Sequence, residues 1–406
     1  MAVGWHRPTR LLIDTQAIKA NVENERQRMP QGSVLFAVVK ANGYGHGAVE
    51  TARAAKEGGA SGFCVALLDE AIELRQAGIT EPILILSVVD PAYIPSLLMY
   101  GISVTVATRE WLVEAAEQLK EESYEQPLNV HIKVDTGMGR IGFTSPQATK
   151  EAALFIKNNP NFHLEGIFTH CSTADLKDST YFDQQTARFK ENLDQLSELP
   201  RYVHISNSAT ALWHPDNVGN MIRFGVAMYG LNPSGRSLPE PYPLQPALTL
   251  ISSLIQVKEL LPGEGIGYGK TYTTNQREWV GTIPIGYADG WLRHLQGFSV
   301  LVNGYPCEII GRICMDQCMI RLPKQVPVGT KVTLIGEDQG QTITMQMVAE
   351  KLGTINYEVA CTFSQRIPRE YTNKIGNSKW SKEVTHMLET YPLLSVADKV
   401  RPVGKT

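Results

Sequence analysis

The chain has 406 residues, of which 43% are hydrophobic and 19% are charged, and its formal net charge is −3. A single hydrophobic core stops growing at roughly 250 to 300 residues, so this length predicts two domains. The nearly balanced charge argues against nucleic acid or an anionic membrane as the main partner, and it favours a small or neutral substrate.

The N-terminal segment and the cysteines indicate a cytoplasmic protein with reduced thiols. Arg7 and Arg10 precede an apolar stretch that ends at Asp14 without a small-residue cleavage site, so we expect no signal peptide. No uninterrupted apolar run reaches the roughly 18 residues of a membrane span. The cysteines offer one close pair, Cys314 and Cys318, and no second pair to complete a zinc site. The six cysteines stand at positions 64, 171, 307, 314, 318 and 361.

Eight short, β-branched apolar runs recur between residues 34 and 230. They are continuous rather than alternating and are separated by helix-like segments, which is typical of buried parallel strands with crossover helices. The runs are VLFAVVK (34–40), GFCVAL (62–67), PILILS (82–87), ISVTVA (102–107), NVHIKVD (129–135), LEGIFTH (164–170), YVHISNS (202–208) and MIRFGVAMYG (221–230). This pattern predicts an α/β fold, an N-terminal (β/α)8 TIM-type barrel, with a doubly wound open sheet as the alternative.

The pattern changes after LNPSGRSLPEPYPLQP (231–246), which is rich in proline and glycine. Strand-like runs broken by Gly, Asn-Gly and Pro-containing turns follow, with one clear helix around MQMVAEKLG (345–353). RLLID (10–14) could pair with either domain, and a C-terminal helix is expected from about residue 376. We therefore predict a barrel over residues 1–240, a mainly β domain over 241–385 and a C-terminal tail over 386–406.

Polar residues end several of the apolar runs. In a parallel barrel the active site lies at the carboxyl ends of the strands, so these residues are candidates for function. Each alone has a structural explanation, since a strand-end lysine reaches solvent, a lone histidine is usually a satisfied core residue, and SNSAT often caps a helix. Their convergence on one rim indicates a functional site. They are Lys40, Asp135, Arg140, His170, Ser206, Asn207, Ser208, Arg223 and Gly225.

The glycines of NGYGHG (42–47) could cradle a phosphate, but this signal is weak because Lys40 precedes the loop. Barrels build their recurring phosphate site from the loops after strands seven and eight, where Ser208 offers a hydroxyl and Gly225 an unhindered N–H group. Lys40 could then hold the aldehyde of an aromatic phosphate as a Schiff base. The ligand that fits is pyridoxal 5'-phosphate.

Eight motifs, in order and over nearly the whole chain, resemble those of bacterial alanine racemases. They are AVVKANGYGHG, KVDTGMGRIGF, FTHCSTAD, MIRFGVAMYG, GEGIGYGKTY, GYADGW, GRICMDQ and INYEVACTFSQRIPR. Members of this family are pyridoxal-phosphate enzymes of the barrel-plus-β-domain type. Many of them have alanine where this chain has Gly43, which changes little beyond the stiffness of the loop.

The resemblance implies an isomerase that interconverts L-alanine and D-alanine by a two-base mechanism and supplies D-alanine for peptidoglycan. It also implies a homodimer with shared active sites. Lys40 would hold the cofactor and act as one base, and Tyr268 from the partner's β domain would act as the other. His170 and Arg223 would stand behind Tyr268, and Arg223 would face the cofactor's pyridine nitrogen.

The resemblance assigns further residues to the cofactor and the substrate. Arg140 would lie near the cofactor's phenolic oxygen and, with Met315, bind the substrate carboxylate. Lys133 would be carbamylated to N6-carboxylysine and orient Arg140. Tyr287 and Tyr357 would narrow the entrance, which favours a small side chain. The remaining cofactor-binding positions are Tyr44, Asn207, Ser208, Gly225, Val226 and Tyr357; no metal is expected.

Three other classes of protein share parts of this pattern. A pyridoxal-phosphate decarboxylase could have the same architecture, but it needs no Tyr268 base and benefits from a full electron sink, which Arg223 weakens. A single-barrel pyridoxal-phosphate carrier would not need the residues after the barrel. A Schiff-base aldolase predicts no pyridoxal cofactor.

Overall fold

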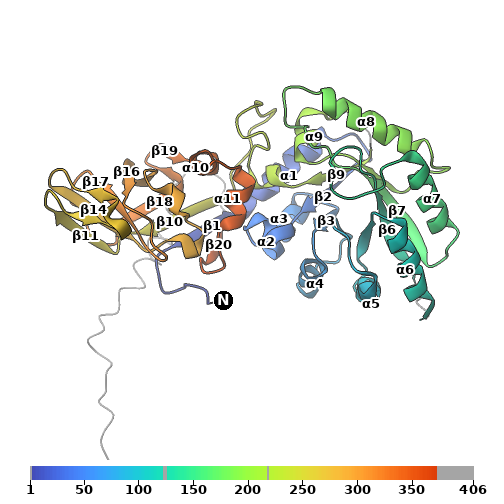
Figure 1. The fold of residues 1–406 in the computed structure, drawn as a ribbon, viewed down its shortest axis with the longest axis horizontal. Helices are drawn as coiled ribbons and strands as arrows, with labels where there is room; N and C mark the ends of the chain where they lie inside the picture. The colour runs from blue at the N-terminus through green and yellow to red at the C-terminus, as the bar shows by residue number, and fades with distance from the viewer. Residues whose placement is uncertain (1, 122–125, 217–218, 373–406) are drawn as a thin grey trace, which may run out of the picture.

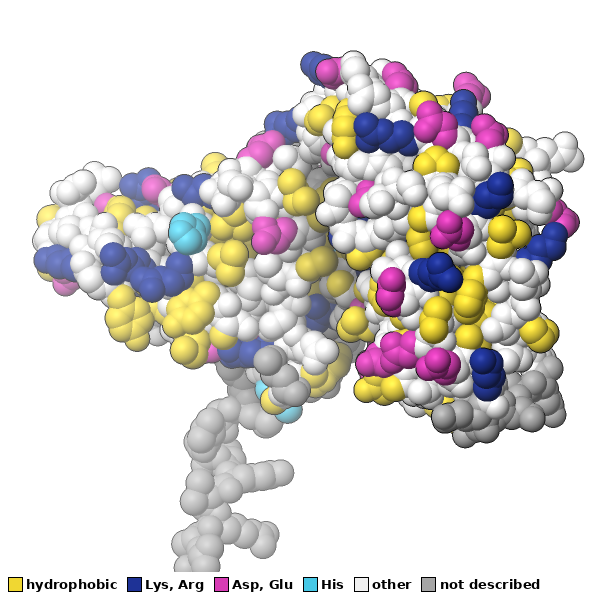
Figure 2. Space-filling model, turned by 45° about the vertical axis from the view of Figure 1, so that its right-hand side comes forward, with side chains coloured by type: hydrophobic (Ala, Val, Ile, Leu, Met, Phe, Trp, Pro, Cys, Tyr) yellow, Lys and Arg dark blue, Asp and Glu magenta, His cyan; other side chains and the backbone are white. Residues whose placement is uncertain are grey.

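The computed structural model describes residues 2–121, 126–216 and 219–372. The C-terminal helix expected from about residue 376 and the tail over 386–406 lie outside the described residues. Two domains lie side by side, a barrel and a β domain (Figure 1). No helix in the described part of the chain combines the length and the apolar character that crossing a membrane requires. Acidic and basic side chains are interspersed over the barrel face seen in Figure 2.

The barrel consists of eight parallel strands, paired in the order β8-β7-β6-β5-β4-β3-β2-β9. The two ends of this sheet meet, because the Asn220 N–H group donates to the Val203 carbonyl at 2.9 Å and the Arg223 N–H group donates to the Ser206 carbonyl at 3.0 Å. The predicted barrel is confirmed, and the open-sheet alternative is wrong. The strands are β2 (Val34–Val38), β3 (Gly62–Val65), β4 (Ile83–Ile85), β5 (Ser103–Val106), β6 (Leu128–Lys133), β7 (Phe162–Phe168), β8 (Tyr202–His204) and β9 (Met221–Phe224).

Helices surround these strands (Figure 1). Each buries an apolar or alanine-rich face: Ala48, Ala52 and Ala55 form that face on α3. The Asp14 carboxylate caps α1 by accepting hydrogen bonds from two N–H groups of its first turn. The helices are α1 (Thr15–Arg28), α3 (Ala48–Glu57), α4 (Leu68–Gln76), α5 (Ile94–Met99), α6 (Arg109–Glu121), α7 (Pro146–Lys157), α8 (Thr180–Leu193) and α9 (Ser208–Trp213).

The second domain is built on a ten-stranded sheet with the order β11-β14-β17-β16-β15-β18-β10-β1-β20, and β19 pairs with β18. RLLID, whose pairing the sequence left open, is β1 (Arg10–Asp14), and it pairs with β10 and β20. The N-terminal strand therefore belongs to the β domain's sheet. The other strands are β10 (Leu248–Ser253), β11 (Gln256–Leu260), β14 (Glu278–Ile283), β15 (Ser299–Val302), β16 (Tyr305–Ile310), β17 (Cys318–Leu322), β18 (Lys331–Asp338), β19 (Gln341–Ile343) and β20 (Arg369–Thr372), with β12 (Gly265–Ile266) and β13 (Tyr272–Thr273) forming a separate hairpin.

Two helices accompany this sheet. The predicted helix around residue 345 is α10 (Met345–Leu352). A second helix, α11 (Asn356–Thr362), follows it and was missed, because its short sequence NYEVACT contains β-branched residues and no strong helix pattern. α11 packs against α10 and against α2 (Lys40–Tyr44), so it lies at the junction of the two domains (Figure 1).

Gly45 ends α2 at a point where the barrel backbone lies close to α11. Its φ is +80°, and a Cβ atom there would lie 2.2 Å from the Ala360 carbonyl oxygen. Gly78 has a φ of +85° with no atom within 4 Å of its Cβ position.

We expect Gly78→Ala to cost about 1 kcal/mol from backbone strain alone, whereas Gly45→Ala should cost about 2 kcal/mol more from overpacking. Thermal unfolding of both variants measures this, and equal Tm values would contradict the close approach.

Candidate functional site

A cavity of about 460 Å³ lies at the carboxyl ends of the barrel strands. Four basic side chains line it, from Lys40, Lys133, Arg140 and Arg223, and no Asp or Glu is among its described lining residues. The cavity is therefore electrostatically suited to an anionic ligand. The predicted site residues that line it are Lys40, Tyr44, Lys133, Arg140, His170, Asn207, Ser208, Arg223, Gly225, Val226 and Tyr357.

Lys40 enters this cavity from a left-handed backbone turn. The four residues after it have φ values between 51° and 60°. For residues other than glycine this conformation costs roughly 1–2 kcal/mol each, so the surroundings must hold it in place. The Ala41 N–H group donates to the Glu70 carboxylate at 2.6 Å, and the Asn42 side-chain oxygen accepts from the Ala48 N–H group at 3.0 Å. The turn follows β2 and places Tyr44 in the lining of the cavity.

His46 holds the same turn through two of its backbone carbonyls. Its side chain is completely buried, and its Nδ1 lies 3.1 Å from the Gly43 carbonyl and 2.9 Å from the Tyr44 carbonyl. Because carbonyls only accept, Nδ1 carries the proton. Burial lowers the pKa of His46 to about 4, so the ring is neutral, and it packs against the Tyr229 ring at a tilt of 32° with 4.4 Å between centroids. His46 thus holds the loop after Lys40 through two carbonyls and a ring contact.

The Lys40 amine is held in an environment that disfavours its charge. Burial lowers its pKa, and the nearby Arg140 charge lowers it further, while Glu70 acts in the opposite direction. A lysine in this environment more readily supplies the neutral amine that a nucleophile or base requires.

A cluster of hydroxyl and backbone groups lies on the other side of the cavity. The Gly225 N–H group donates to Ser208 Oγ at 2.9 Å, and the Ala227 N–H group approaches the same oxygen at 3.4 Å. A Cβ atom on Gly225 would lie 3.0 Å from the Tyr44 hydroxyl. Glycine therefore leaves room for Tyr44 beside Ser208, as expected of a small oxyanion subsite.

Arg223 lies at the floor of the cavity and is nearly completely buried. Its guanidinium donates to the Thr169 carbonyl at 2.9 Å and to His204 Nδ1 at 2.8 Å, and it lies 3.4 Å from His170 Nδ1. Burial lowers the pKa of Arg223 to about 10, so it stays protonated at neutral pH. Burial and then Arg223 lower the pKa of both histidines well below the usual value, so both are neutral acceptors.

The contacts of Arg223 continue into the barrel interior. His204 Nε2 lies 2.9 Å from His131 Nδ1, and His131 Nε2 lies 3.0 Å from the Glu165 carboxylate. Ser103 Oγ donates to that carboxylate at 2.5 Å. This hydrogen-bonded series of residues was not predicted from the sequence. Its only signal was the presence of His131 and His204 in the middle of buried apolar strands, which is also how a satisfied core histidine looks.

The loop after β6 places Arg140 over the cavity. The Asp135 carboxylate accepts from the N–H groups of Gly137, Gly139 and Arg140, each at 3.0 Å. Burial raises the pKa of Asp135, but these N–H groups and the charge of Lys133 lower it more, so the carboxylate is ionised. Asp135 thus folds the glycine-rich TGMGR segment around itself.

Lys133 is 2% exposed at the end of β6. Its Nζ donates to the Val134 carbonyl at 2.7 Å and to the Ile141 carbonyl at 3.3 Å. Burial lowers its pKa to about 8, with Arg223 and Arg140 also lowering it and Asp135 opposing them. A minor fraction of this lysine is therefore neutral near physiological pH, more than for an exposed lysine.

The β domain contributes Tyr357 to the cavity through α11. The Tyr357 ring lies 6.3 Å from the Tyr44 ring, measured between centroids. Burial raises the pKa of both tyrosines, so their hydroxyls keep their protons. The other predicted β-domain residues, Tyr268, Tyr287 and Met315, do not line this cavity and are 71%, 39% and 52% exposed.

Comparison with known proteins gives the family. Residues 13–233 match the family model described as the alanine racemase N-terminal domain, and residues 247–371 match the model of the alanine racemase C-terminal domain. An alanine racemase of Levilactobacillus brevis is 56% identical over 371 residues, covering 91% of this chain and 100% of that protein. The second model spans residues that a single-barrel carrier would lack, so that alternative is wrong.

Solved structures agree with these matches. The crystal structure of alanine racemase from E. faecalis superposes with a TM-score of 0.90 at 70% identity and covers 92% of this chain and 100% of that chain. A histidine racemase from Leuconostoc mesenteroides superposes with a TM-score of 0.86 at 32% identity and covers 91% and 99%. Fold and site thus define a two-domain isomerase that acts on amino acids, of the pyridoxal-phosphate-dependent type. The chain belongs to the alanine racemase family.

Proposed function

We propose that this chain interconverts L-alanine and D-alanine with pyridoxal 5'-phosphate held in the barrel cavity. The observation that carries the proposal is the composition of that cavity, in which the amine of Lys40 shares the lining with the guanidinium groups of Arg140 and Arg223 and with no Asp or Glu among the described lining residues. The ligands concerned are a phosphate ester and an amino-acid carboxylate, and both are anions. In a bacterium the D-alanine would supply peptidoglycan, and the protein would act in the cytoplasm.

The residues of the cavity fit the parts of this cofactor. The hydroxyls of Ser208 and Tyr44 and the open backbone at Gly225 suit its phosphate. Asn207 and Val226 line the same side, and Arg140 suits the phenolic oxygen. When bound, the cofactor supplies an electron sink that acidifies the α-hydrogen of the amino acid.

Arg223 would face the pyridine nitrogen and limit that sink. Its guanidinium is protonated and has His204 and Thr169 as fixed partners, so it disfavours a second proton on the ring nitrogen. A weaker electron sink favours proton exchange alone over side reactions such as transamination. This distinguishes the proposal from a decarboxylase, which benefits from a full sink.

Racemisation requires two proton-transferring groups, because a proton leaves one face of the α-carbon and another arrives at the opposite face. Lys40 supplies one, since burial lowers the pKa of its amine and so raises the neutral fraction. The cavity tyrosines, Tyr44 and Tyr357, are poor candidates for the other because burial raises their pKa. Tyr268 is 71% exposed outside this cavity, which supports its assignment to the site of a second copy.

The substrate would be small and bound by its carboxylate. Arg140 and, from the second copy, Met315 would contact the carboxylate, while Tyr357 and the second copy's Tyr287 would narrow the entrance. Extra bulk in a tight apolar pocket costs 10- to 200-fold in specificity, in rough terms, which favours a methyl side chain. A shared site of this kind requires a homodimer.

We further propose that Lys133 is carbamylated. The burial that lowers its pKa to about 8 leaves a neutral amine able to react with carbon dioxide near neutral pH, and the resulting anion would pair with Arg140. After incubation with ¹³C-bicarbonate, we expect a carbamate carbonyl signal in the NMR spectrum. The signal should be absent from Lys133→Met; its persistence in that variant would contradict the assignment.

The racemase proposal predicts that the protein loaded with pyridoxal phosphate converts either enantiomer of alanine into an equal mixture. Chiral chromatography of L-alanine, D-alanine, L-serine and L-histidine, incubated in parallel, measures this. Serine should react more slowly than alanine, and histidine should not react detectably. A protein that gains no visible absorbance with pyridoxal phosphate, or that leaves alanine unchanged, would overturn the proposal.

Two lysine variants provide the control for that assay. Lys40→Ala should abolish conversion in both directions because it removes both the attachment point and one base. Lys150→Ala removes an exposed lysine of α7 and should retain wild-type rates. Comparable losses in both variants would point to general instability instead of chemistry at Lys40.

A further inference from the structure

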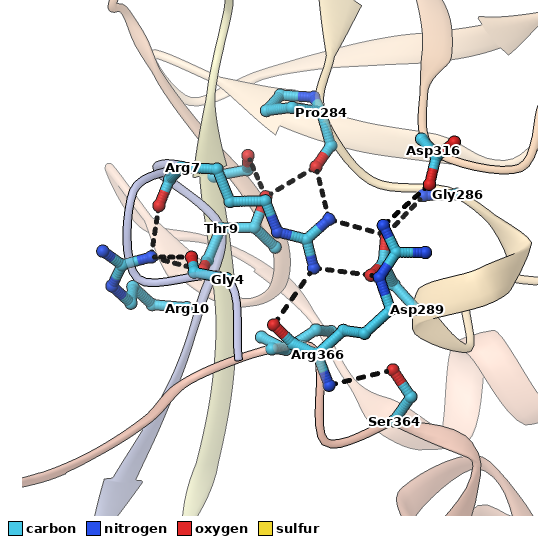
Figure 3. A network of polar contacts seen from close by, with 12 residues as sticks. Gly4, Arg7, Thr9, Arg10, Pro284, Gly286, Asp289, Asp316, Ser364 and Arg366 are labelled. Carbon is cyan, nitrogen blue, oxygen red and sulfur yellow. Dashed lines mark hydrogen bonds and ion pairs between the residues drawn. The ribbon is translucent and has the colours of Figure 1, made fainter. Parts of the chain in front are cut away.

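The β domain contains a buried carboxylate, Asp289, with two arginines bound to it, one before β1 and one before β20 (Figure 3). Arg7, before β1, binds it in a bidentate manner with N–O distances of 2.9 and 2.5 Å. Arg366, before β20, approaches it through Nε at 3.5 Å. The Asp289 side chain is 0% exposed. A movement of the loop that carries Asp289 would separate its buried charge from the two arginines. Because leaving a buried charge unpaired costs free energy, this strongly favours the observed position of the loop.

Asp289 is joined directly to the loop that carries Tyr287. The Gly286 N–H group donates to the Asp289 carboxylate at 3.1 Å, which closes the short turn around η4 (Tyr287–Asp289). The Arg7 guanidinium also reaches the Pro284 carbonyl at 3.4 Å, at the start of this segment. The side chain of Tyr287 therefore projects from a turn whose two ends are fixed.

The same turn is bound to the loop that carries Met315. The Tyr287 N–H group donates to the Cys314 carbonyl at 3.1 Å, and the Ala288 N–H group donates to the Met315 carbonyl at 3.0 Å. A Cβ atom on Gly286 would lie 2.4 Å from the Met315 carbonyl oxygen, so the two loops are in close backbone contact. A shift of one loop must move the other.

A second link runs from Asp289 to that loop through Arg366. Its guanidinium bonds to the Asp316 carboxylate at 2.7 Å while its Nε faces Asp289 (Figure 3). The Ser364 N–H group donates to the Asp289 carbonyl at 3.1 Å, which ties the turn to the segment after α11. Asp289 thus bonds directly to two segments that are far from it in sequence, and it is linked to the Met315 loop through Arg366.

We propose that Asp289 is a positioning residue that fixes the Tyr287 and Met315 loops as one unit for the active site of a second copy of this chain. This inference rests on the function proposed above, in which both residues act in the partner's site. Asp289 would act through these loops without contacting substrate or cofactor. Since a misplacement of 1 Å can cost about 100-fold in rate, the precision of the unit matters for the reaction.

Asp289→Asn should weaken substrate use and leave the cofactor unaffected, because the cofactor residues belong mainly to the barrel. We expect KM for alanine to rise about tenfold, with a smaller change in kcat and an unchanged visible spectrum of the loaded enzyme.

Asp316→Asn removes only the exposed end of the network, does not threaten folding, and should raise KM in the same direction by a smaller factor. Glu308→Gln, which disrupts the exposed ion pair with Arg321 in the same domain, is the matched control and should change nothing.

Mixed dimers separate a positioning role from a folding defect. In a dimer of one Lys40→Ala and one Asp289→Asn chain, purified through two different tags, one site carries both lesions and the other carries neither. We expect about half of the wild-type activity per dimer at low alanine concentration, far above either parent. The reference pair, Lys40→Ala with Tyr268→Phe, reports on the shared site itself.

The outcomes are distinct. Recovery in the reference pair without recovery in the Asp289→Asn pair would overturn the role of Asp289 and leave the proposed function intact. Failure of the reference pair would remove the shared site and the inference with it. Unchanged KM in both Asp289→Asn and Asp316→Asn would also overturn the inference, and the Asp316 variant decides the matter if Asp289→Asn does not fold.

Discussion

The hydrogen bond from the Arg223 N–H group to the Ser206 carbonyl joins the two ends of the barrel sheet, and the site depends on that closure. Without it, β8 and β9 would lie at opposite edges of an open sheet. Closure brings Ser208, which follows β8, next to Gly225, which follows β9 and lies beside the Lys40 turn because β9 pairs with β2. It also sets Arg223 against His204, so the strand that closes the barrel supplies the cation at the floor of the cavity.

Concentrated positive charge is the second feature of the site. Lys40, Lys133, Arg140 and Arg223 share one cavity, and burial lowers the pKa of both lysines and of Arg223. Such a cluster opposes folding unless partners offset it, and the histidines beside Arg223 do so by remaining neutral acceptors. The remaining positive potential suits phosphate and carboxylate groups.

Much of this architecture could be predicted from the sequence. Continuous β-branched runs identified the barrel strands, and the rule that parallel barrels are active at their carboxyl ends singled out Lys40, His170 and Ser208. The left-handed turn after Lys40 could not be predicted, because Ala41 and Tyr44 have no preference for that conformation and are held there by tertiary contacts. The roles proposed for Tyr268, Tyr287 and Met315 rest only on family resemblance, since no local pattern distinguishes an exposed residue that would act in another chain's site.

The central claim is that Lys40, and not its neighbour Lys133, forms the covalent link to the cofactor. Lys133 Nζ donates hydrogen bonds to two carbonyls, whereas Lys40 lies at the start of the left-handed turn and lines the cavity. Borohydride reduction of the protein loaded with pyridoxal phosphate, followed by peptide mass spectrometry, tests this directly. We expect the phosphopyridoxyl mass on the peptide that contains Lys40. The same mass on Lys133 or another lysine, or on no peptide at all, would contradict it.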